Sequence, residues 1–427
     1  MERLSGLSGV ELRPGVEELD IGGFPIGRPL ALARPRDEAA LCALVARCAE
    51  LRLGLVPVGA RTAYWRPLSL GERVAVDLSA LNSLRFEDGL MHAGAGVTVQ
   101  AASQALRARG LHLPLHPDAF GQTSLGAMAA VACTSGIGMG QGGFGRWLAG
   151  LRVVDGLGRL IPTGSAAIGA PLMREGLPDL TGLVLGAEGA LGVVAGLSLH
   201  LPPPTHLVHL RGRARDGGEI LSLGRSLAGL YDTIRAQRPF EAGRGWGDWE
   251  LDIWVCSPLS MEEARARAEV VRGRVAGLEI LPDPYFGRFA GEPADFARFA
   301  AHARLVGLDI NAGYAQGAEL LALAAQLADE AVALPVPHLR LALYLSPELL
   351  NLGLHLSLPH EQLPWGHAFQ QRGLLALSRW PVVPYRLGHA WPAAMRDKLD
   401  PGYLALLRGF KAAVDPHGVL NPGHPWI

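Results

Sequence analysis

The chain of 427 residues is 49% hydrophobic and 19% charged, with a formal net charge of −1. This composition excludes a disordered chain and predicts large buried cores, and the length is sufficient for two domains. The near-neutral balance, with lysines and arginines dispersed, argues against nucleic acid or an anionic membrane as partners.

Two features of the sequence concern its cellular compartment. The amino-terminal stretch MERLSGLSGVELRPG lacks the basic start and apolar core of a signal peptide. The four cysteines make no C-x-x-C pair, which is typical of buried free thiols in a reducing environment; they are Cys42, Cys48, Cys133 and Cys256. We therefore expect a soluble, cytoplasmic protein.

The first predicted elements follow one another in RPRDEAALCALVARCAELRLGLVPVG, residues 34–59. Apolar residues recur at helical spacing from Leu41 to Leu51, and an alternating run then ends at Gly59, which predicts a helix followed by a strand. The stretches VAVDLSALNSLRF and LMHAGAGVTVQAASQALRARG repeat this pattern. They predict short strands and then a helix from about Thr98 to Arg109.

The segment RVVDGLGRLIPTG, residues 152–164, has two apolar runs around Asp155-Gly156, which predicts a β-hairpin. Residues 182–204 read GLVLGAEGALGVVAGLSLHLPPP and are apolar enough to resemble a membrane span. Five glycines and Glu188 would destabilise such a helix, so we expect tight turns between buried strands instead. The chain up to about Pro204 is thus predicted to be an α+β domain.

PPPT at residues 202–205 predicts a linker, because consecutive prolines neither continue a helix nor donate to a sheet. Beyond it, HLVHLRGRA, WELDIWVCS and LEILP are strand-like, whereas EILSLGRSLAGLYDTI and MEEARARAEVVRGRVAG are helical. This alternation predicts an antiparallel sheet with helices on one face. The segment from about Tyr385 to the end has a different character.

Three glycine-rich segments place small residues where a backbone could approach a ligand. They are VPVGARTAYW at 56–65, HPDAFGQTSLGA at 116–127 with SGIGMGQGGFG at 135–145, and GAEGALGVV at 186–194. None is a G-x-G-x-x-G fingerprint that opens a helix or a G-x-x-x-x-G-K-[ST] loop, so a Rossmann nicotinamide site is not expected.

Taken in order, and with the terminal VDPHGVLNPG, these segments resemble the PCMH-type FAD-binding flavoproteins, the vanillyl-alcohol oxidase and p-cresol methylhydroxylase superfamily. The resemblance covers most of the chain. It implies an α+β fold in which a two-part FAD-binding domain, residues 1–204 and 386–427, holds an inserted α/β cap domain at 205–385. The cap would contain an antiparallel sheet, and FAD would lie extended with its ring at the junction of the domains.

The resemblance also implies which residues form the FAD site, with Glu188 and its neighbouring glycines in contact with the flavin. The cofactor-binding residues implied are Pro57, Gly59, Ala60, Arg61, Thr62, Ala63, Tyr64, Pro117, Asp118, Thr123, Ser124, Gly126, Ala127, Gly136, Gly143, Gly145, Glu188, Gly189, Gly192, Val193 and Asn421. Read without the resemblance, Glu188 fits a salt-bridged turn in the core. The FAD is expected to be bound non-covalently, although His355, His360, His367, His389 and Tyr344 lie in the region of the family's covalent anchors.

The catalytic residues implied are Tyr64, Tyr385 and Arg386, which resemble the groups that hold a phenolate in the phenol-oxidising branch. Two tyrosine hydroxyls and a guanidinium can together depress a phenol's pKa, and the phenolate then favours departure of a hydride. We therefore expect an FAD-dependent oxidase or dehydrogenase that oxidises a para-substituted phenol or aromatic alcohol. The branch's usual acid is missing, since Cys133, Thr134 and Ser135 precede the Gly136-Ile137-Gly138-Met139 run.

Two alternatives stay open. One is a 2-hydroxy acid dehydrogenase of the lactate or glycolate type, although no His-x-Gly-Asp-Gly run is present and the histidines of HLSLPHEQLPWGH predict no metal site. The other is a flavin-binding, non-catalytic subunit of an electron-transfer complex. A small-molecule substrate is expected whether the enzyme oxidises a phenol or a 2-hydroxy acid. An electron-acceptor protein and a second copy of the chain stay open as partners.

Overall fold

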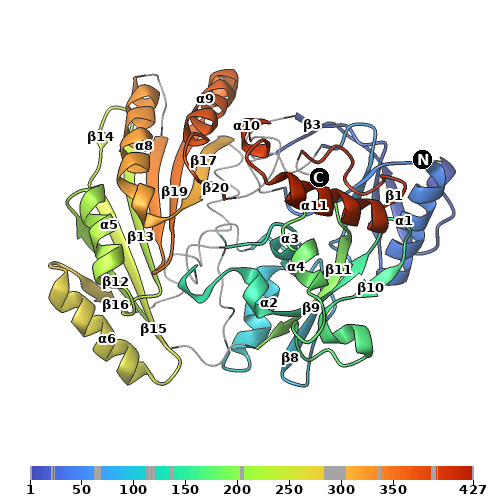
Figure 1. The fold of residues 1–427 in the computed structure, drawn as a ribbon, viewed down its shortest axis with the longest axis horizontal. Coiled ribbons are helices and arrows are strands. Elements are labelled where there is room, and N and C mark those ends of the chain that lie inside the picture. The colour runs from blue at the N-terminus through green and yellow to red at the C-terminus, as the bar shows by residue number, and fades with distance from the viewer. Residues whose placement is uncertain are drawn as a thin grey trace.

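The computed structural model describes residues 2–20, 23, 25–61, 69–111, 113, 117, 121–134, 139–201, 206–282, 304–333, 338–385, 391 and 393–425. They form two lobes (Figure 1). One lobe, here the two-sheet lobe, contains the amino-terminal sheets and the carboxyl-terminal helix. The other, the nine-stranded lobe, is built on a single large sheet.

The first sheet of the two-sheet lobe has the strand order β1 (Val10–Pro14), β4 (Ala31–Pro35), β6 (Val74–Asp77), β5 (Leu55–Val58). β6 runs parallel to both β4 and β5, as expected for a β-α-β unit. Its helix α1 (Glu38–Leu51) begins at Asp37, whose carboxylate accepts from the amide of Ala40 at 2.8 Å. The helix and strand predicted in this segment are confirmed.

The second sheet is antiparallel, with the order β10 (Leu160–Pro162), β9 (Leu148–Val154), β11 (Val193–His200), β8 (Leu90–Gly94), β7 (Leu84–Glu87). The predicted hairpin is β9–β10, and Asp155 closes its turn by accepting from the amides of Leu157 and Arg159. Two helices pack beside this sheet, α2 (Val99–Arg107) and α3 (Leu125–Ala130). Thr98 and Ser124 cap them through their side-chain oxygens.

The nine-stranded sheet has the order β16 (Glu279–Leu281), β12 (His206–Ala214), β15 (Trp249–Ser257), β13 (Thr233–Glu241), β18 (His338–Leu345), β19 (Leu350–Leu358), β17 (Arg304–Ala312), β20 (Val383–Pro384), and β14 (Gly245–Trp246) pairs with β13. Its described pairings are antiparallel. Four helices cover the face turned away from the two-sheet lobe (Figure 1): α5 (Gly217–Ser226), α6 (Met261–Arg274), α8 (Gly317–Val332) and α9 (Leu363–Leu377).

The two faces of this sheet differ in chemistry. On β19, Leu350, Leu352, Leu354, Leu356 and Leu358 all belong to the core beneath the helices. Because successive side chains alternate across a strand, the residues between these leucines lie on the opposite face, here called the inner face. They are Asn351, Gly353, His355 and Ser357. The inner face meets the two-sheet lobe where Met139 packs against Ala342 and Tyr344.

The carboxyl terminus returns to the two-sheet lobe (Figure 1). Leu420 bridges to Leu55, and the amide of Gly156 donates to the carbonyl of Val414 at the end of α11 (Pro401–Val414). The remaining named elements are short: β2 (Glu18–Leu19), β3 (Pro25–Gly27), α4 (Leu180–Val184), α10 (Ala393–Arg396) and six 3₁₀ turns, Glu2–Leu4, Met139–Gln141, Phe144–Trp147, Gly164–Ile168, Tyr314–Gln316 and His360–Gln362.

One predicted helix is too long. EILSLGRSLAGLYDTI was expected to be helical throughout, but α5 ends at Ser226 and Thr233 already begins β13. Gly229 has a φ of 82°, which a helix cannot accommodate, and the β-branched Thr233 and Ile234 favour a strand. The antiparallel sheet with helices on one face is confirmed.

The predicted linker at 202–205 lies outside the described residues, and the domain limits at 204 and 386 stay predictions. In the part of the chain that the structure describes, no helix is both long enough and apolar enough to span a bilayer. Within the same residues, no three histidine, cysteine, aspartate or glutamate side chains form a cluster that could hold a metal ion.

Candidate functional site

Three of the glycine-rich segments meet at the carboxyl end of β5. Gly59 and Ala60 are exposed there, and a Cβ added to Gly59 would lie 3.3 Å from the Cβ of Ala127 in α3. On the other side, a Cβ added to Gly189 would overlap the ring of Pro57. The structure therefore brings the loops after β5, before α3 and before β11 into direct contact, with exposed backbone between them.

The loop before β11 is held in a conformation that favours glycine. Gly186, Glu188 and Gly189 have φ values of 80°, 49° and 82°, and the amides of Gly186 and Glu188 donate to the carbonyls of Ala129 and Ala130. Gly192 has a φ of 146°, and a Cβ there would overlap Val153. The glycine spacing of this segment thus reflects a loop folded tightly onto the end of α3.

Glu188, the one acid in this loop, is 6% exposed and has two partners from the carboxyl terminus. Its Oε2 lies 3.2 Å from Nε2 of His424, and its carbonyl accepts from Nδ2 of Asn421 at 2.8 Å. Nδ1 of His424 is buried and has no hydrogen-bond partner in the described structure. Glu188 is therefore tied to the carboxyl terminus, and the pairing leaves Nδ1 of His424 open beside the proposed FAD site.

Lys411 joins the same loop to the carboxyl-terminal motif. Its Nζ donates to the carbonyls of Ala190 and Leu420 and to Oδ2 of Asp415, each at 2.7 Å. Asp415 also accepts from the amides of Val419 and Leu420. Burial lowers the pKa of the Lys411 ammonium, while the Asp415 carboxylate opposes this shift. The motif VDPHGVLNPG is thus a structural clamp on the loop that carries Glu188.

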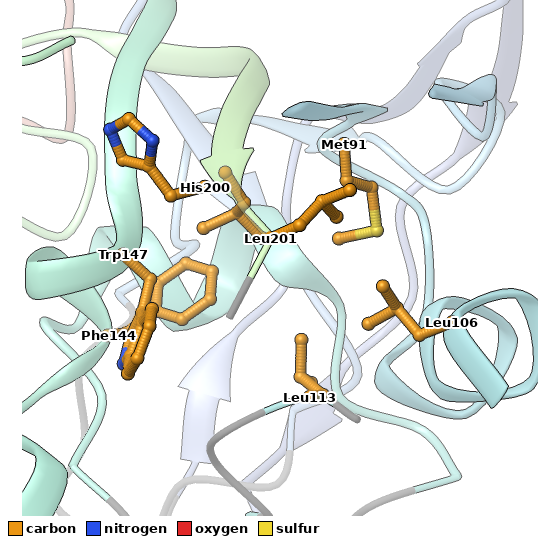
Figure 2. Close-up of a pocket in the computed structure, with 8 residues that line it drawn as sticks. Met91, Leu106, Leu113, Phe144, Trp147, His200 and Leu201 are labelled. Carbon is orange, nitrogen blue, oxygen red and sulfur yellow. The ribbon is translucent and has the colours of Figure 1, made fainter. Parts of the chain in front are cut away.

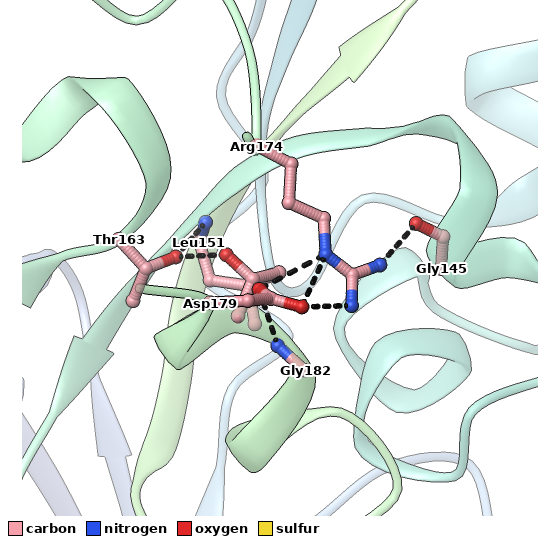
Figure 3. Close-up of polar contacts among 7 residues, drawn as sticks. Gly145, Leu151, Thr163, Arg174, Asp179 and Gly182 are labelled. Atoms are coloured by element: carbon pink, nitrogen blue, oxygen red, sulfur yellow. Dashed lines mark hydrogen bonds and ion pairs between the residues drawn. The ribbon is translucent and has the colours of Figure 1, made fainter. Parts of the chain in front are cut away.

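A second clamp holds the loop around Gly145 (Figure 3). Nη1 of Arg174 donates to the carbonyl of Gly145 at 2.9 Å, while its Nε and Nη2 contact Oδ2 of Asp179 at 2.9 and 2.5 Å. Asp179 in turn caps α4 by accepting from the amide of Gly182 at 2.9 Å. The hydrogen bond from Arg174 lowers the pKa of the Asp179 carboxyl. Gly143 lies close by, its added Cβ 3.1 Å from Cγ2 of Thr134.

These residues fit an FAD molecule on two observations. Four non-glycine residues with positive φ surround the meeting point of the loops, a backbone strain that is concentrated at binding sites; they are Arg61, Ala132, Glu188 and Asn421. The exposed backbone of Gly59 and Ala60 and the open nitrogen of His424 provide polar groups for a ligand. Arg61 is paired with Glu18 and would bring a guanidinium near a diphosphate.

Other predicted FAD contacts have local structural roles or cannot be described. Val193 packs in the core with Val74 and Leu420, and the carbonyl of Thr123 accepts from Val99. An added Cβ on Gly126 would contact Ala95, so this glycine serves close packing of α3. Pro117 is half-buried. The predictions at Thr62, Ala63, Tyr64, Asp118 and Gly136 lie outside the described residues.

Tyr385 joins the lobes on the other side of the site. Its hydroxyl donates to the carbonyl of Thr134 at 2.7 Å, and its amide donates to the carbonyl of Asp309 in β17 at 3.2 Å. One predicted catalytic residue therefore lies at the contact between the lobes. Whether Tyr64 and Arg386 accompany it is not described, because both lie outside the described residues.

The inner face next to Tyr385 carries a chain of polar contacts that the sequence did not predict. Nε2 of His355 lies 2.9 and 3.1 Å from the two carboxylate oxygens of Asp309, and its Nδ1 lies 3.2 Å from Nη2 of Arg340. The side chains of His355 and Asp309 are 7% and 8% exposed. The absence of a side chain at Gly353 leaves room for this pair, since an added Cβ would lie 2.7 Å from both Asp309 Oδ1 and His355 Cε1.

A second pair of the same residue types lies toward the opposite edge of this sheet. Oδ1 of Asp252 is 2.8 Å from Nε2 of His209 and 2.9 Å from Nε of Arg211. The ring of His209 stacks on Trp254 with centroids 4.6 Å apart. Between the two pairs, Arg235 lies over the ring of Tyr344 at 5.8 Å. Polar side chains thus extend along the inner face from β12 to β17.

Alternation itself was the signal for this surface. In LNLGLHLSL every second residue is leucine and the others are small or polar, a period-2 pattern with a chemical difference between the faces. From the sequence, His355 and Tyr344 are predicted only as candidate covalent anchors of the flavin. A small cavity in the two-sheet lobe is lined mostly by apolar side chains (Figure 2); Met91, Leu106, Leu113, Phe144, Trp147, Leu199, His200 and Leu201 line it.

Known sequences show an FAD binding domain in this chain. Residues 29–164 match a family model described as an FAD binding domain. A D-2-hydroxyglutarate dehydrogenase of Xanthomonas citri pv. viticola is 30% identical over 231 residues, 52% of this chain and 46% of that protein. A mitochondrial D-lactate dehydrogenase (cytochrome) of Arabidopsis thaliana is 28% identical over 187 residues, 42% of this chain and 32% of that protein. The matched region is less than half of either relative.

Solved structures show the same fold over nearly the whole chain. The 4-ethylphenol oxidase from Gulosibacter chungangensis superposes with a TM-score of 0.77 at 13% identity, covering 95% of this chain and 91% of that one. An alkyldihydroxyacetonephosphate synthase superposes with a TM-score of 0.69 at 12% identity, covering 93% and 76%. The sequence match identifies an FAD binding domain within residues 29–164, and the solved structures show that the fold of the chain is that of PCMH-type flavoproteins.

Proposed function

We propose that this flavoprotein is an FAD-dependent oxidoreductase whose small organic substrate lies between the flavin and the inner face of the nine-stranded sheet. The observation that carries this proposal is the inner face itself. A sheet face that only packed against another lobe would be apolar, whereas this one keeps Asp309, His355 and Asn351 buried at the contact between the lobes. Convergent polar groups in a buried setting are typical of ligand sites.

For the substrate, the contacts favour a 2-hydroxy acid over the para-substituted phenol that the sequence placed first. Arg340 offers a guanidinium for a carboxylate, and His355 offers an imidazole for a hydroxyl proton. Dehydrogenases that act on D-2-hydroxyglutarate and D-lactate are among the sequence relatives, which supports the same class.

The residues of this chain would divide the work as follows. When bound, FAD supplies the acceptor for a hydride. Asp309 accepts from Nε2 of His355 and so orients the imidazole, as a carboxylate does for a catalytic histidine. Tyr385 links the two lobes beside the proposed site through its hydrogen bond to the carbonyl of Thr134.

A para-substituted phenol is the second candidate, and Tyr385 supports it. Its hydroxyl lies at the contact between the lobes, where the family holds a phenolate, and the 4-ethylphenol oxidase shares the fold.

A cytoplasmic location, an electron-acceptor protein and a second copy of the chain stay predictions from the sequence.

Anaerobic mixing of the purified holoprotein with 2-hydroxy acids and with 4-alkylphenols tests the proposal. We expect the flavin absorbance to bleach with at least one 2-hydroxy acid and to remain unchanged with the phenols. Bleaching with phenols alone would establish the second candidate. A bound flavin that neither class reduces, but a partner protein does, would indicate a non-catalytic subunit.

A further inference from the structure

Arg340 differs from Arg211, which is paired with Asp252, in having no carboxylate partner among the residues that the structure describes. It stands directly opposite His355 in the pairing of β18 with β19 and is half-buried. Its Nη2 donates to Nδ1 of His355 at 3.2 Å. A guanidinium has five N–H donors and is always charged, so a half-buried one with a single neutral acceptor favours an anionic ligand.

The contacts of His355 determine which of its nitrogens carries the proton. Arg340 can only donate, so Nδ1 must accept and holds a lone pair. The carboxylate of Asp309 can only accept, so Nε2 carries the hydrogen. The nitrogen that would take a proton from a substrate is therefore the one that Arg340 occupies.

We propose that Arg340 is a specificity-determining residue that covers Nδ1 of His355 until a substrate carboxylate draws the guanidinium away. This inference rests on the proposed oxidation of a 2-hydroxy acid. Once uncovered, Nδ1 accepts the hydroxyl proton and the imidazolium is held by Asp309. The C–H electron pair leaves with its hydrogen as a hydride to the flavin, and the C–O bond becomes the carbonyl of the 2-oxo acid. The same movement of the Arg340 guanidinium thus binds the substrate carboxylate and exposes Nδ1 of His355.

The second His–Asp pair provides the matched control. Arg211 donates to Oδ1 of Asp252 at 2.9 Å, and His209 lies on the same carboxylate oxygen at 2.8 Å. It already has a counter-ion, so a substrate anion would have to compete with Asp252. Arg211 and Arg340 therefore differ in the property that the proposal requires.

Steady-state kinetics of the holoprotein test the specificity, with a 2-hydroxy acid and its uncharged amide as the two substrates. In Arg340→Met we expect kcat/KM for the acid to fall about 100-fold, because only the acid uses the guanidinium, whereas kcat/KM for the amide should not fall and should rise, because the methionine leaves Nδ1 of His355 uncovered. Arg211→Met should change neither by more than about threefold. Equal losses for acid and amide in Arg340→Met would overturn the proposal. If the methionine variant does not fold, Arg340→Lys replaces it in this test, because lysine keeps the positive charge but lacks the planar pair of N–H donors of the guanidinium.

Nitrogen NMR of His355 tests the movement without turnover, with oxalate as an unreactive dianion. Comparison with His355→Gln assigns the signals. Without oxalate, we expect Nδ1 to be unprotonated and Nε2 protonated. Oxalate should shift the Nδ1 signal in the native protein and leave it in place in Arg340→Met. An unchanged Nδ1 signal in the native protein at saturating oxalate would overturn the proposal. Failure of every 2-hydroxy acid to bleach the flavin would instead reject the proposed function, since the oxalate result does not depend on it.

Discussion

The two lobes that face the proposed site differ in the groups that they offer to a ligand. On the two-sheet lobe the ligand-facing groups are backbone and small residues, held by clamps such as Lys411 with Asp415 and Arg174 with Asp179. On the nine-stranded lobe they are charged and polar side chains that stand on rigid strands. A cofactor shared by many enzymes can be held by backbone amides, whereas recognition of one substrate requires particular side chains.

The same contrast recurs within the inner face. Both His–Asp pairs are buried, but Asp309 and His355 lie beside Tyr385 and the other lobe, whereas Asp252 and His209 stack against Trp254 toward the β16 edge. The two pairs thus contain the same residue types at different positions on the sheet. Substitutions in each lobe and in each pair should therefore show which residues affect flavin reduction, which affect FAD binding and which affect stability.

The largest effect is expected at His355. In His355→Gln we expect the rate at which the 2-hydroxy acid reduces the flavin to fall by about 10²–10⁴-fold, the usual contribution of a general base. The flavin content should be unchanged. His209→Gln is the matched control and should stay within about threefold. Stopped-flow bleaching of the flavin measures both. Equal losses in the two variants would mean that the central pair has no chemical role.

Gly189→Ala should act on the other wall. The added Cβ would overlap Pro57 at a φ of 82°, so we expect a tenfold or greater loss of FAD affinity, on the order of 1–3 kcal/mol of strain. Gly71→Ala has open space around its Cβ and should retain FAD. Titration of the apoprotein with FAD distinguishes them. An unchanged affinity in Gly189→Ala would remove this loop from the proposed FAD bed.

Asp252→Asn should cost stability without affecting chemistry. It leaves the buried His209 without its carboxylate, which typically lowers the free energy of unfolding by about 1–3 kcal/mol. Denaturant unfolding measures the loss, and the rate of flavin bleaching should stay near the native value. A drop in that rate with unchanged stability would assign chemistry to the edge pair as well.

The smallest effect concerns His92, a buried histidine bonded to Ser198 at 2.8 Å rather than to a carboxylate. Burial lowers its pKa from the usual 6.5, and Arg85 and Arg152 add to the shift. Below pH 6.5 the unfolded chain therefore binds a proton that the folded chain does not, so stability declines as the pH falls toward the lowered pKa. Unfolding between pH 8 and 5.5 should show this decline in the native protein and less of it in His92→Gln. An equal decline in both would assign it to other groups.

Local sequence patterns were sufficient for the elements whose signals are local. The helix at α1, the turn at Asp155 and the glycine loop around Glu188 follow from periodicity, turn residues and the lack of a Cβ. The helix predicted through Thr233 was wrong, since a helical spacing of apolar residues there continued into a buried strand. The FAD-binding loops could be anticipated because their order along the chain carries the resemblance.

The contacts of the inner face could not be anticipated in this way. Asp309, Arg340 and His355 come from three strands, and only the pairing register of β17, β18 and β19 makes them neighbours. The sequence by itself indicated the cofactor class, through the resemblance that the order of its loops carries. It also contained the alternation that makes one face of this sheet polar, because alternation depends on local spacing. Only the tertiary structure decided which His–Asp pair meets the other lobe, because strand order and register are set by packing across the whole sheet.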